Sequence, residues 1–368
     1  MDLHSNDPSQ QFNNQFQPYS RRVEFSGNAS EFFSIWIVNI VLTLLTLGIY
    51  SAWAKVRTYR YFYGHTQLDG HRFDYLATPI QILKGRILAF ICFALYMFFV
   101  NFIPLLGILA VFVLMFLIPW IVNQGMRFNM RMSRYRNIRF NFQGSYGEAF
   151  VVFLLLPFLS VFTLYLLLPY VFKRIDQYLH SNIEFAGTPI TVETRGGEYY
   201  LAALMAYVAA AIVGVVLLAV AGVFGFGLEA LAQVDQSTEA AATVAGVVAL
   251  VMISVVYMVA LAVGTGIYQT HIRNHILNSS EIDGIVDFKS DLKMIDYTLL
   301  IFTNSLALVF SLGLAYPWTK VRKTRMLAQA TEITILCDPQ QLHDQLGEQD
   351  SSFAEEAAGM FDIDLSLG

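Results

Sequence analysis

Residues 39–60 read NIVLTLLTLGIYSAWAKVRTYR, and residues 304–325 read NSLALVFSLGLAYPWTKVRKTR. The two stretches align without a gap. They share an Asn, a Leu-Gly pair, a Trp and the basic sequence Lys-Val-Arg-x2-Arg at the same places. Each runs out of an apolar segment into a basic one, as a helix does where it leaves a membrane for its polar surface. The pair therefore predicts a repeated membrane unit.

The composition supports a membrane protein. Hydrophobic residues make up 56% of the chain and charged residues 14%, whereas an ordinary soluble domain carries about 25% charged residues. Several apolar runs reach the roughly 20 residues that cross a hydrocarbon core of about 30 Å. We read seven apolar segments, at 31–54, 80–102, 104–122, 148–172, 198–226, 241–268 and 294–318. The predicted fold is a polytopic α-helical membrane protein with internal repeats.

Short motifs between the membrane segments alternate apolar and polar residues, which is the period of a half-buried strand. They are Val23-Glu24-Phe25, Arg72-Phe73-Asp74-Tyr75, Ile138-Arg139-Phe140-Asn141-Phe142, Ile183-Glu184-Phe185, Val286-Asp287-Phe288 and Thr331-Glu332-Ile333-Thr334-Ile335. Two of the motifs continue into the same tripeptide, Thr78-Pro79-Ile80 and Thr188-Pro189-Ile190. These short strands predict a small cytoplasmic β element and mark where the repeats begin.

The repeats suggest a division of the chain. We expect a disordered polar tail at 1–20, a first membrane repeat at 21–146 and a second at 147–290. A terminal half-repeat at 291–336 precedes an acidic cytoplasmic tail at 337–368, because no Lys or Arg follows Arg325.

The basic residues predict an unusual topology. Lys and Arg accumulate in cytoplasmic loops, and here they follow segments one, three, four, six and seven. Seven ordinary crossings would place these stretches on alternating sides. One resolution is that segments 31–54, 148–172 and 294–318 are broken or re-entrant, with breaks at Thr46-Leu47-Gly48 and at Pro157. The other is seven crossings with a weakly obeyed charge rule. Both tails are expected in the cytoplasm.

A polar stripe runs along segment one, and part of it recurs in segment seven. An amide within hydrocarbon needs a partner, so the stripe must face protein or water. Hydrogen bonding between helices is one interpretation, and a substrate or ion path is the other. The candidate path residues are Asn39, Thr43, Thr46, Tyr50, Asn304 and Ser311.

The basic end of each copy places one Trp and two Arg on a single helix face, at i, i+4 and i+7. We favour interfacial anchors, with Trp at the depth of the lipid headgroups and Arg reaching the phosphates. The alternative is a pair of clamps for anions or lipid headgroups. The residues are Trp53, Arg57, Arg60, Trp318, Arg322 and Arg325.

Small residues recur every four positions in segment five, which allows helices to approach closely. They are Ala202, Ala206, Ala210 and Gly214. This stripe predicts tight packing within or between subunits, so a homo-oligomer is one expected form.

Sequence motifs for catalysis, metals and nucleic acid are weak. His271 and His275 share a helix face near Glu281, but the HExxH pattern is missing and the ligand set is short. No Walker loop or GxSxG elbow occurs. We expect no catalytic residues, no metal and no cofactor. Basic aromatic stretches such as 134–140 lie beside membrane segments, which favours membrane lipids over nucleic acid as partners.

The stretch from Thr46 to Arg57, preceded by Phe25-x-Gly27 and followed by Phe73-x-Tyr75, resembles the YjgN family of bacterial inner-membrane proteins. The resemblance covers about residues 20 to 335. The second copy departs from the first, with Pro317 in place of Ala52 and Ala315 in place of Tyr50. The resemblance implies an inner-membrane location and a domain of unknown function, with no catalytic residues to carry over.

Two functions follow as expectations. The first is a transporter or channel-like protein for an anionic or lipid-like substrate, because duplicated halves with interrupted hydrophobic segments are the usual pointer to such a site. The alternative is a non-transporting scaffold whose sheet and acidic tail recruit a cytoplasmic partner. A membrane enzyme comes third.

Overall fold

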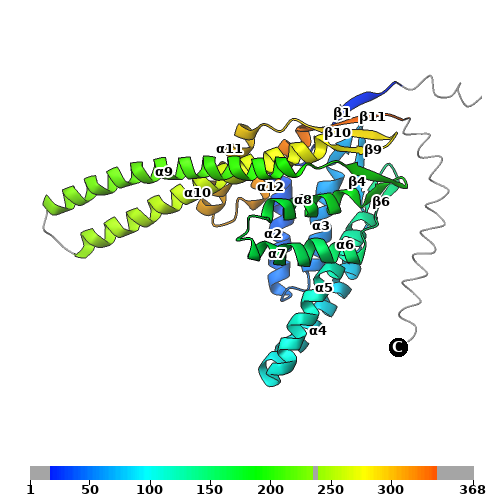
Figure 1. Ribbon diagram of the computed structural model, residues 1–368, viewed down its shortest axis with the longest axis horizontal. Coiled ribbons are helices and arrows are strands. Elements are labelled where there is room, and N and C mark those ends of the chain that lie inside the picture. The colour runs from blue at the N-terminus through cyan, green and yellow to red at the C-terminus, as the bar shows by residue number, and fades with distance from the viewer. Residues whose placement is uncertain (1–16, 235–238, 338–368) are drawn as a thin grey trace, which may run out of the picture.

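The computed structural model describes residues 17–234 and 239–337. The predicted polar tail up to residue 16 lies outside these ranges, as does the predicted acidic tail from residue 338 onward. Within them the chain forms one antiparallel sheet, from which helical hairpins extend (Figure 1). The sheet draws its strands from the whole length of the described chain.

The sheet has eleven strands in the order β1-β11-β10-β9-β8-β7-β6-β5-β4-β3-β2. All six predicted strand motifs contribute to it, which confirms the β element but makes it far larger than expected. β1 begins inside the segment predicted as a disordered tail. The strands are β1 (Tyr19–Arg22), β2 (Glu24–Phe25), β3 (Thr66–Leu68), β4 (His71–Tyr75), β5 (Ser133–Tyr135), β6 (Ile138–Phe142), β7 (Ile183–Phe185), β8 (Thr188–Val192), β9 (Ser280–Ile282), β10 (Val286–Ser290) and β11 (Thr331–Ile335).

Tight hairpins supply most of the strands that the motifs did not reveal. Three hairpins turn through two residues that both have positive φ, which is the turn that matches the twist of the flanking strands. The turn residues are Asp69-Gly70, Arg136-Asn137 and Ala186-Gly187. The first two turns each pair a predicted strand with an unpredicted neighbour of three residues, and the third pairs the predicted β7 with the five-residue β8.

The two Thr-Pro-Ile tripeptides have different structures. Thr78 forms a capping box with Gln81 and Pro79 begins a helix, where Pro suits the first turn. Pro189 instead lies inside β8 and pairs with Glu184 of β7. The tripeptide therefore does not mark equivalent places in two repeats, and the predicted division into repeats stays a prediction.

One segment closes the sheet into a nearly complete barrel. β1 pairs with β11, and β2 pairs with β3 at the opposite end of the strand order. Only Val23 separates β1 from β2, and its N–H donates to the carbonyl of Thr331 at 2.9 Å. The first described strands therefore join both edges of the sheet, and residues distant in sequence meet there.

Two long helical hairpins hold the four candidate membrane spans. The first joins α4 (Pro79–Phe102) to α5 (Pro104–Arg131), and the second joins α9 (Gly196–Val234) to α10 (Glu239–Asn278). They correspond to the predicted segments two, three, five and six, although most of these helices continue several residues beyond the predicted ends. Figure 1 shows the two hairpins leaving the sheet in different directions.

The other three apolar segments are short hairpins that begin and end at the sheet. In each of these segments the chain therefore leaves the sheet, reverses and returns to the same sheet. The first is α2 (Ala29–Leu45) with α3 (Ser51–Gly64), and the third is α11 (Met294–Phe310) with α12 (Tyr316–Gln329). The second runs through α6 (Tyr146–Phe150), the π-helical turn η1 (Val151–Leu155) and α7 (Leu156–Phe162), and returns as α8 (Leu168–Ser181).

The same backbone conformation reverses all three short hairpins. Two consecutive residues adopt positive φ, with φ of 49° and 93° at Leu47 and Gly48 and of 51° and 89° at Leu312 and Gly313. The second hairpin turns likewise at Leu164-Tyr165. The predicted break at Thr46-Leu47-Gly48 is therefore correct. The predicted break at Pro157 is wrong, because Pro157 lies in the first turn of α7 and the chain stays helical for five more residues.

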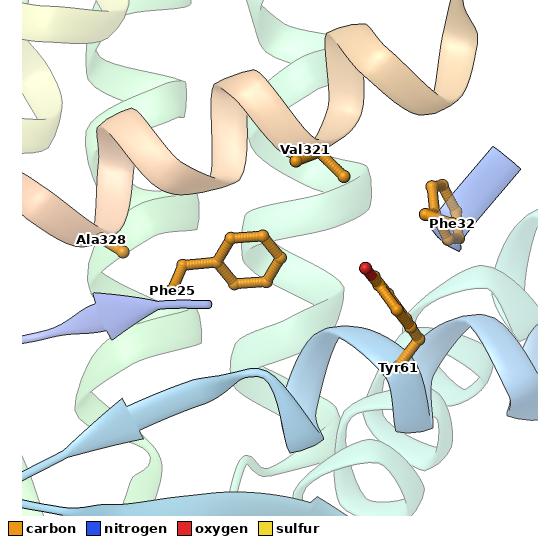
Figure 2. Close-up of a cluster of buried hydrophobic side chains, with 5 residues drawn as sticks. All are labelled: Phe25, Phe32, Tyr61, Val321 and Ala328. Carbon is orange, nitrogen blue, oxygen red and sulfur yellow. The ribbon is translucent and has the colours of Figure 1, made fainter. Parts of the chain in front are cut away.

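The first and third short hairpins share a core with the sheet. Phe25 of β2 packs between α3 and α12, beside Tyr61 and Val321 (Figure 2). Phe32 and Ala328 complete this buried cluster. The two ends of the described chain are thereby held together by apolar burial, which is the dominant favourable term in folding.

Gly27 is required at the edge of this cluster. A Cβ at residue 27 would lie 2.7 Å from Cε1 of Phe25. We predict that Gly27→Ala lowers the free energy of unfolding by about 1–3 kcal/mol, the usual range for overpacking. Thermal unfolding in detergent would measure the loss. Gly64→Ala is the matched control, since a Cβ there meets nothing within 4 Å; equal stability of the two variants would contradict the prediction.

Ionic contacts fasten the closing strand to the hairpin turns. The carboxylate of Asp69, in the β3–β4 turn, accepts from the Tyr19 hydroxyl at 2.8 Å and from Nε of Arg21 at 3.3 Å. Arg136 reaches it from the β5–β6 turn at 2.6 Å. Burial by itself raises the pKa of Asp69, but these hydrogen bonds and charges outweigh it and lower the pKa below its ordinary value.

The Asp69 contacts predict acid sensitivity. A carboxyl group with a lowered pKa in the folded state stabilises the protein above its ordinary pKa of about 3.9, and this stabilisation is lost as the pH falls through the lowered value. Because Arg21 is largely exposed, we expect only about 1 kcal/mol. Asp69→Asn should melt at a lower temperature than the wild type at pH 6, and this deficit should shrink steadily as the pH is lowered below about 4. The exposed turn variant Asp283→Asn should match the wild type; a constant deficit in Asp69→Asn would refute the linkage.

Candidate functional site: a groove between the first and last hairpins

The polar stripe and the basic end of the first hairpin meet in the folded chain. Asn39 is 4% exposed, and its Oδ1 accepts from Nη1 of Arg57 at 3.5 Å. The same guanidinium nitrogen donates to the Tyr50 hydroxyl at 3.1 Å. Arg57 therefore turns back toward the apolar arm of its own hairpin.

The last hairpin contains the same pairing at the same separation. Nη1 of Arg322 donates to Oδ1 of Asn304 at 3.3 Å and to Oγ1 of Thr303 at 2.6 Å. Nδ2 of Asn304 donates to the carbonyl of Thr319 at 3.3 Å. Both polar ends of this amide are therefore used within the hairpin.

Two further stripe residues hold the hairpin turns. The N–H of Tyr50 donates to Oγ1 of Thr46 at 2.9 Å, and the N–H of Ala315 donates to Oγ of Ser311 at 2.9 Å. Their side chains satisfy backbone donors that are left without a helical partner where the helix is interrupted. Thr43 differs, because it lines the groove described below.

The remaining predicted anchors also have partners inside the protein. Arg60 donates to the carbonyl of Ala77 at 3.0 Å, and Arg325 donates to the carbonyl of Gly27 at 2.8 Å. The Arg322 guanidinium lies 5.1 Å from the ring centre of Trp318. Trp53 stacks on Tyr50. These contacts occupy groups that the anchor interpretation assigned to lipid phosphates.

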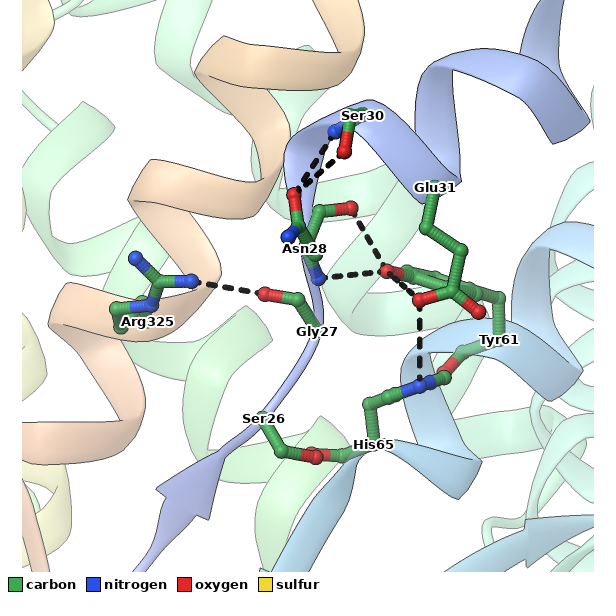
Figure 3. Close-up of polar contacts among 8 residues, drawn as sticks. All are labelled: Ser26, Gly27, Asn28, Ser30, Glu31, Tyr61, His65 and Arg325. Carbon is green, nitrogen blue, oxygen red and sulfur yellow. Dashed lines mark hydrogen bonds and ion pairs between the residues drawn. The ribbon is translucent and has the colours of Figure 1, made fainter.

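A polar network fixes the base of the first hairpin (Figure 3). The N–H of Asn28 donates to the Tyr61 hydroxyl at 2.7 Å, and this hydroxyl donates to the Asn28 carbonyl at 2.8 Å. The Glu31 carboxylate lies 3.3 Å from the same hydroxyl and 3.7 Å from Nε2 of His65. Burial raises the pKa of Tyr61. The contact of Arg325 with Gly27 joins α12 to this base.

An open groove of about 510 Å³ lies between α2, α3 and Tyr316 at the start of α12. Its wall is apolar and aromatic along Trp36, Ile40 and Leu44, and the Trp36 ring lies 5.9 Å from that of Tyr316. Polar side chains converge on it from both arms of the first hairpin. These are Asn39, Thr43, Ser51, Lys55, Thr58 and Tyr59.

The groove holds one polar group without a protein partner. Nδ2 of Asn39 is buried and makes no hydrogen bond. A buried amide N–H that lacks an acceptor is unfavourable by about 1–3 kcal/mol. Asn304, its counterpart in the last hairpin, does not line this groove. The structure thus brings Asn39 and Thr43 to a cavity, while Asn304, Ser311 and Thr46 serve local contacts.

The small-residue stripe lies against the neighbouring helix of its own hairpin. A Cβ at Gly264 of α10 would stand 3.4 Å from Cβ of Ala210 and 3.5 Å from the carbonyl of Ala206. Ala202 is buried, and the nearest contact for a Cβ at Gly214 is Ala260. Packing within one subunit therefore accounts for these contacts.

The two histidines of α10 have separate partners. Nε2 of His271 lies 2.8 Å from the Glu198 carboxylate, and Nε2 of His275 accepts from the N–H of Arg195 at 2.9 Å. Within residues 17–234 and 239–337, the structure contains no cluster of three metal-ligating side chains.

The second hairpin repeats features that the sequence comparison missed. Oγ1 of Thr163 accepts from the N–H of Leu167 at its turn, as Thr46 does in the first hairpin. Lys173 and Arg174 follow on the returning helix α8. Because Tyr165 replaces the glycine and Tyr170 the tryptophan, a motif search centred on Gly and Trp passes over this copy. A search for Thr or Ser before Leu, followed by a basic pair, finds it.

The chain is similar in sequence to bacterial inner membrane proteins. The chain is 25% identical over 353 residues to the inner membrane protein YjgN of Escherichia coli O157:H7, which covers 84% of this chain and 87% of that protein. It is 30% identical to YjgN of Salmonella typhimurium over 151 residues, 41% of this chain and 38% of that one. It is 31% identical to YjgN of Escherichia coli K12 over 147 residues, which is 40% of this chain and 37% of that protein.

No solved structure matches the chain. The family model described as a bacterial protein of unknown function, DUF898, matches residues 20–360. With its four candidate spans, the chain is an inner-membrane protein. It belongs to the DUF898 family of bacterial proteins of unknown function.

Proposed function

We propose that the protein transports anionic, lipid-like substrates and that it engages them from the membrane leaflet next to its sheet. The observation that carries this proposal is the set of three short hairpins with exposed apolar tips. At these tips Leu47 is 95%, Leu164 85% and Leu312 94% exposed. Apolar side chains this exposed are unfavourable in water, so the tips belong in hydrocarbon.

The length of the short hairpins limits their depth. Helices α2 and α11 have 17 residues each. At about 1.5 Å per residue each helix reaches about 25 Å from the sheet. This length is shorter than the bilayer, whose hydrocarbon core is about 30 Å thick and which is thicker still when the headgroups are included. The tips then end within the bilayer, while the two long hairpins cross it.

The charges support a cytoplasmic sheet. The basic residues of the returning helices α3, α8 and α12 lie on the arms that lead back to the sheet, and basic residues near membrane segments favour the cytoplasmic side. With β1 and β11 both in the sheet, the two tails start from that side.

The fold is better suited to a transporter of lipid-like substrates than to a channel with a central pore. In the most apolar stretch of each candidate span, only 6–11% of the residues are buried inside the protein. A single copy of the described chain therefore leaves these helices facing lipid instead of wrapping them around a pore. Substrates that reach the protein through the bilayer are compatible with that exposure.

The scaffold alternative has less support. Both edges of the sheet are joined through β1 and β2, so the described strands offer no long free edge for strand addition by a partner. The acidic tail that would recruit a partner lies outside the described residues.

Cysteine labelling tests the membrane placement. In a background with Cys92 and Cys337 replaced by Ser, we expect His71→Cys, Arg139→Cys and Asp283→Cys to react with a membrane-impermeant maleimide from the cytoplasmic side only. Leu47→Cys and Leu312→Cys should react from neither side, because hydrocarbon excludes the reagent. Labelling of the three sheet positions from opposite sides would refute the placement.

Lipid movement tests the transport itself. In liposomes with a fluorescent phosphatidylglycerol, the wild-type protein should speed exchange between leaflets, measured by dithionite quenching. Leu47→Asp should abolish the acceleration, since a carboxylate at the tip opposes insertion by about 2.5–3.5 kcal/mol. The control is Leu105→Asp, at another exposed residue (78%, against 95% for Leu47) beside the turn of the α4–α5 hairpin, and it should keep the wild-type rate. A wild-type rate equal to that of protein-free liposomes would sink the proposal.

A further inference from the structure

We propose that the groove between α2, α3 and α12 binds the headgroup of an anionic phospholipid from the leaflet next to the sheet. This inference rests on the proposed function, because it names the site and class of its substrate. The ligand is an amphiphile with a phosphate diester at the polar side chains and an acyl chain along the apolar wall.

The charge of the groove favours an anion. Lys55 lines it, and no acidic side chain does so among its described lining residues. Two more cations border it, because Arg57 contacts Asn39 and Arg86 of α4 contacts Ser51. Ionisable groups at membrane depth are rare and mark functional sites by default.

Asn39 supplies the second, independent observation. Its Nδ2 is buried without a partner, while its Oδ1 is held by Arg57. The protein thus supplies no acceptor for this N–H, which is covered from solvent at the groove wall. A phosphate oxygen that reaches this N–H would satisfy it, and the hydroxyl of Thr43 on the same groove is a further donor.

The apolar wall distinguishes a lipid from a free phosphate. Trp36, Ile40 and Leu44 form the side of the groove along α2, and Leu44 is itself largely exposed toward the hairpin tip. A soluble anion would leave this surface uncovered, whereas an acyl chain would continue from the groove along the outer face of the hairpin.

The last hairpin lacks a matching site, because its corresponding lysine and asparagine have other partners. Nζ of Lys320, the counterpart of Lys55, lies 4.7 Å from the ring centre of Phe62 and 5.8 Å from that of Phe32. Lys55 has one aromatic neighbour, with its Nζ 5.6 Å from the ring centre of Tyr59. Aromatic faces attract the ammonium group of Lys320. Asn304 likewise has its amide donor satisfied. The last hairpin therefore offers no matching free donor, and the site belongs to the first.

Tryptophan quenching tests the site directly. Trp36 would be kept as the only tryptophan by replacing Trp53, Trp120 and Trp318 with Phe. The protein would be placed in bilayers of phosphatidylcholine with increasing brominated phosphatidylglycerol, or with brominated phosphatidylcholine as the reference. We expect the anionic lipid to quench Trp36 with an apparent affinity at least about fivefold higher, the ratio that one lipid-facing cation supplies.

Variants separate the site from general attraction to the surface. Lys55→Gln and Asn39→Leu should bring the preference for phosphatidylglycerol close to one. Lys323→Gln is the matched control, because it removes a cation from α12 that faces Tyr297 instead of the groove. An unchanged preference in Lys55→Gln, or an equal loss in Lys323→Gln, would overturn the assignment even if Asn39→Leu fails to fold.

Two further readouts make the outcomes distinct. Millimolar glycerol 3-phosphate should not reverse the quenching by phosphatidylglycerol; reversal would assign the site to a soluble phosphate and overturn the lipid proposal. If Trp36 shows the lipid preference but the protein does not speed leaflet exchange, the assignment of this site stands and the transport proposal is refuted. If the protein speeds leaflet exchange but Trp36 shows no preference for the anionic lipid, the transport proposal stands and the assignment of this site is refuted.

Discussion

The closure of the sheet is the constraint on which the other features depend. A sheet edge exposes unpaired backbone groups and invites pairing with other chains. Here the segment from β1 to β2 hydrogen-bonds to β11 on one side and to β3 on the other. Every helical hairpin between these strands must leave the sheet and return to it. Between two neighbouring strands the chain therefore runs out and back, and the seven apolar segments resolve into two long and three short hairpins.

Placed in the bilayer as we propose, the short hairpins need a reversal that hydrocarbon tolerates. Residues with positive φ are usually Gly, Asn or Asp, and another L-residue in that conformation loses about 1–2 kcal/mol. Leu47, Leu164 and Leu312 nevertheless adopt it. At the tip of a hairpin inserted in a bilayer, an Asp would lose about 2.5–3.5 kcal/mol. The strained leucine is therefore the better choice, and Thr or Ser beside it satisfies the backbone donors that the turn exposes.

The arginines show how tertiary contacts redirect a sequence motif. Arg57 and Arg322 carry the spacing of interfacial anchors, yet each guanidinium turns back to an asparagine of its own hairpin. A charged hydrogen bond is worth more in a low dielectric than in water. The same pairing has different consequences in the two hairpins. Asn304 is satisfied by Thr319, whereas Asn39 keeps a free donor beside a groove.

The sequence by itself determined the membrane class, the apolar segments and six of the strands, because hydrophobicity and alternation are local properties. It also located the Leu-Gly reversals at both ends of the chain. The partner strands β3, β5, β8 and β9 escaped detection, since their stability comes from cross-strand hydrogen bonds and not from their own pattern. The two Thr-Pro-Ile tripeptides could not be told apart, because one caps α4 and the other pairs with β7. Only the tertiary structure decided that Asn39, Lys55 and Tyr316 share one groove, since that depends on how two hairpins at opposite ends of the chain pack on a closed sheet.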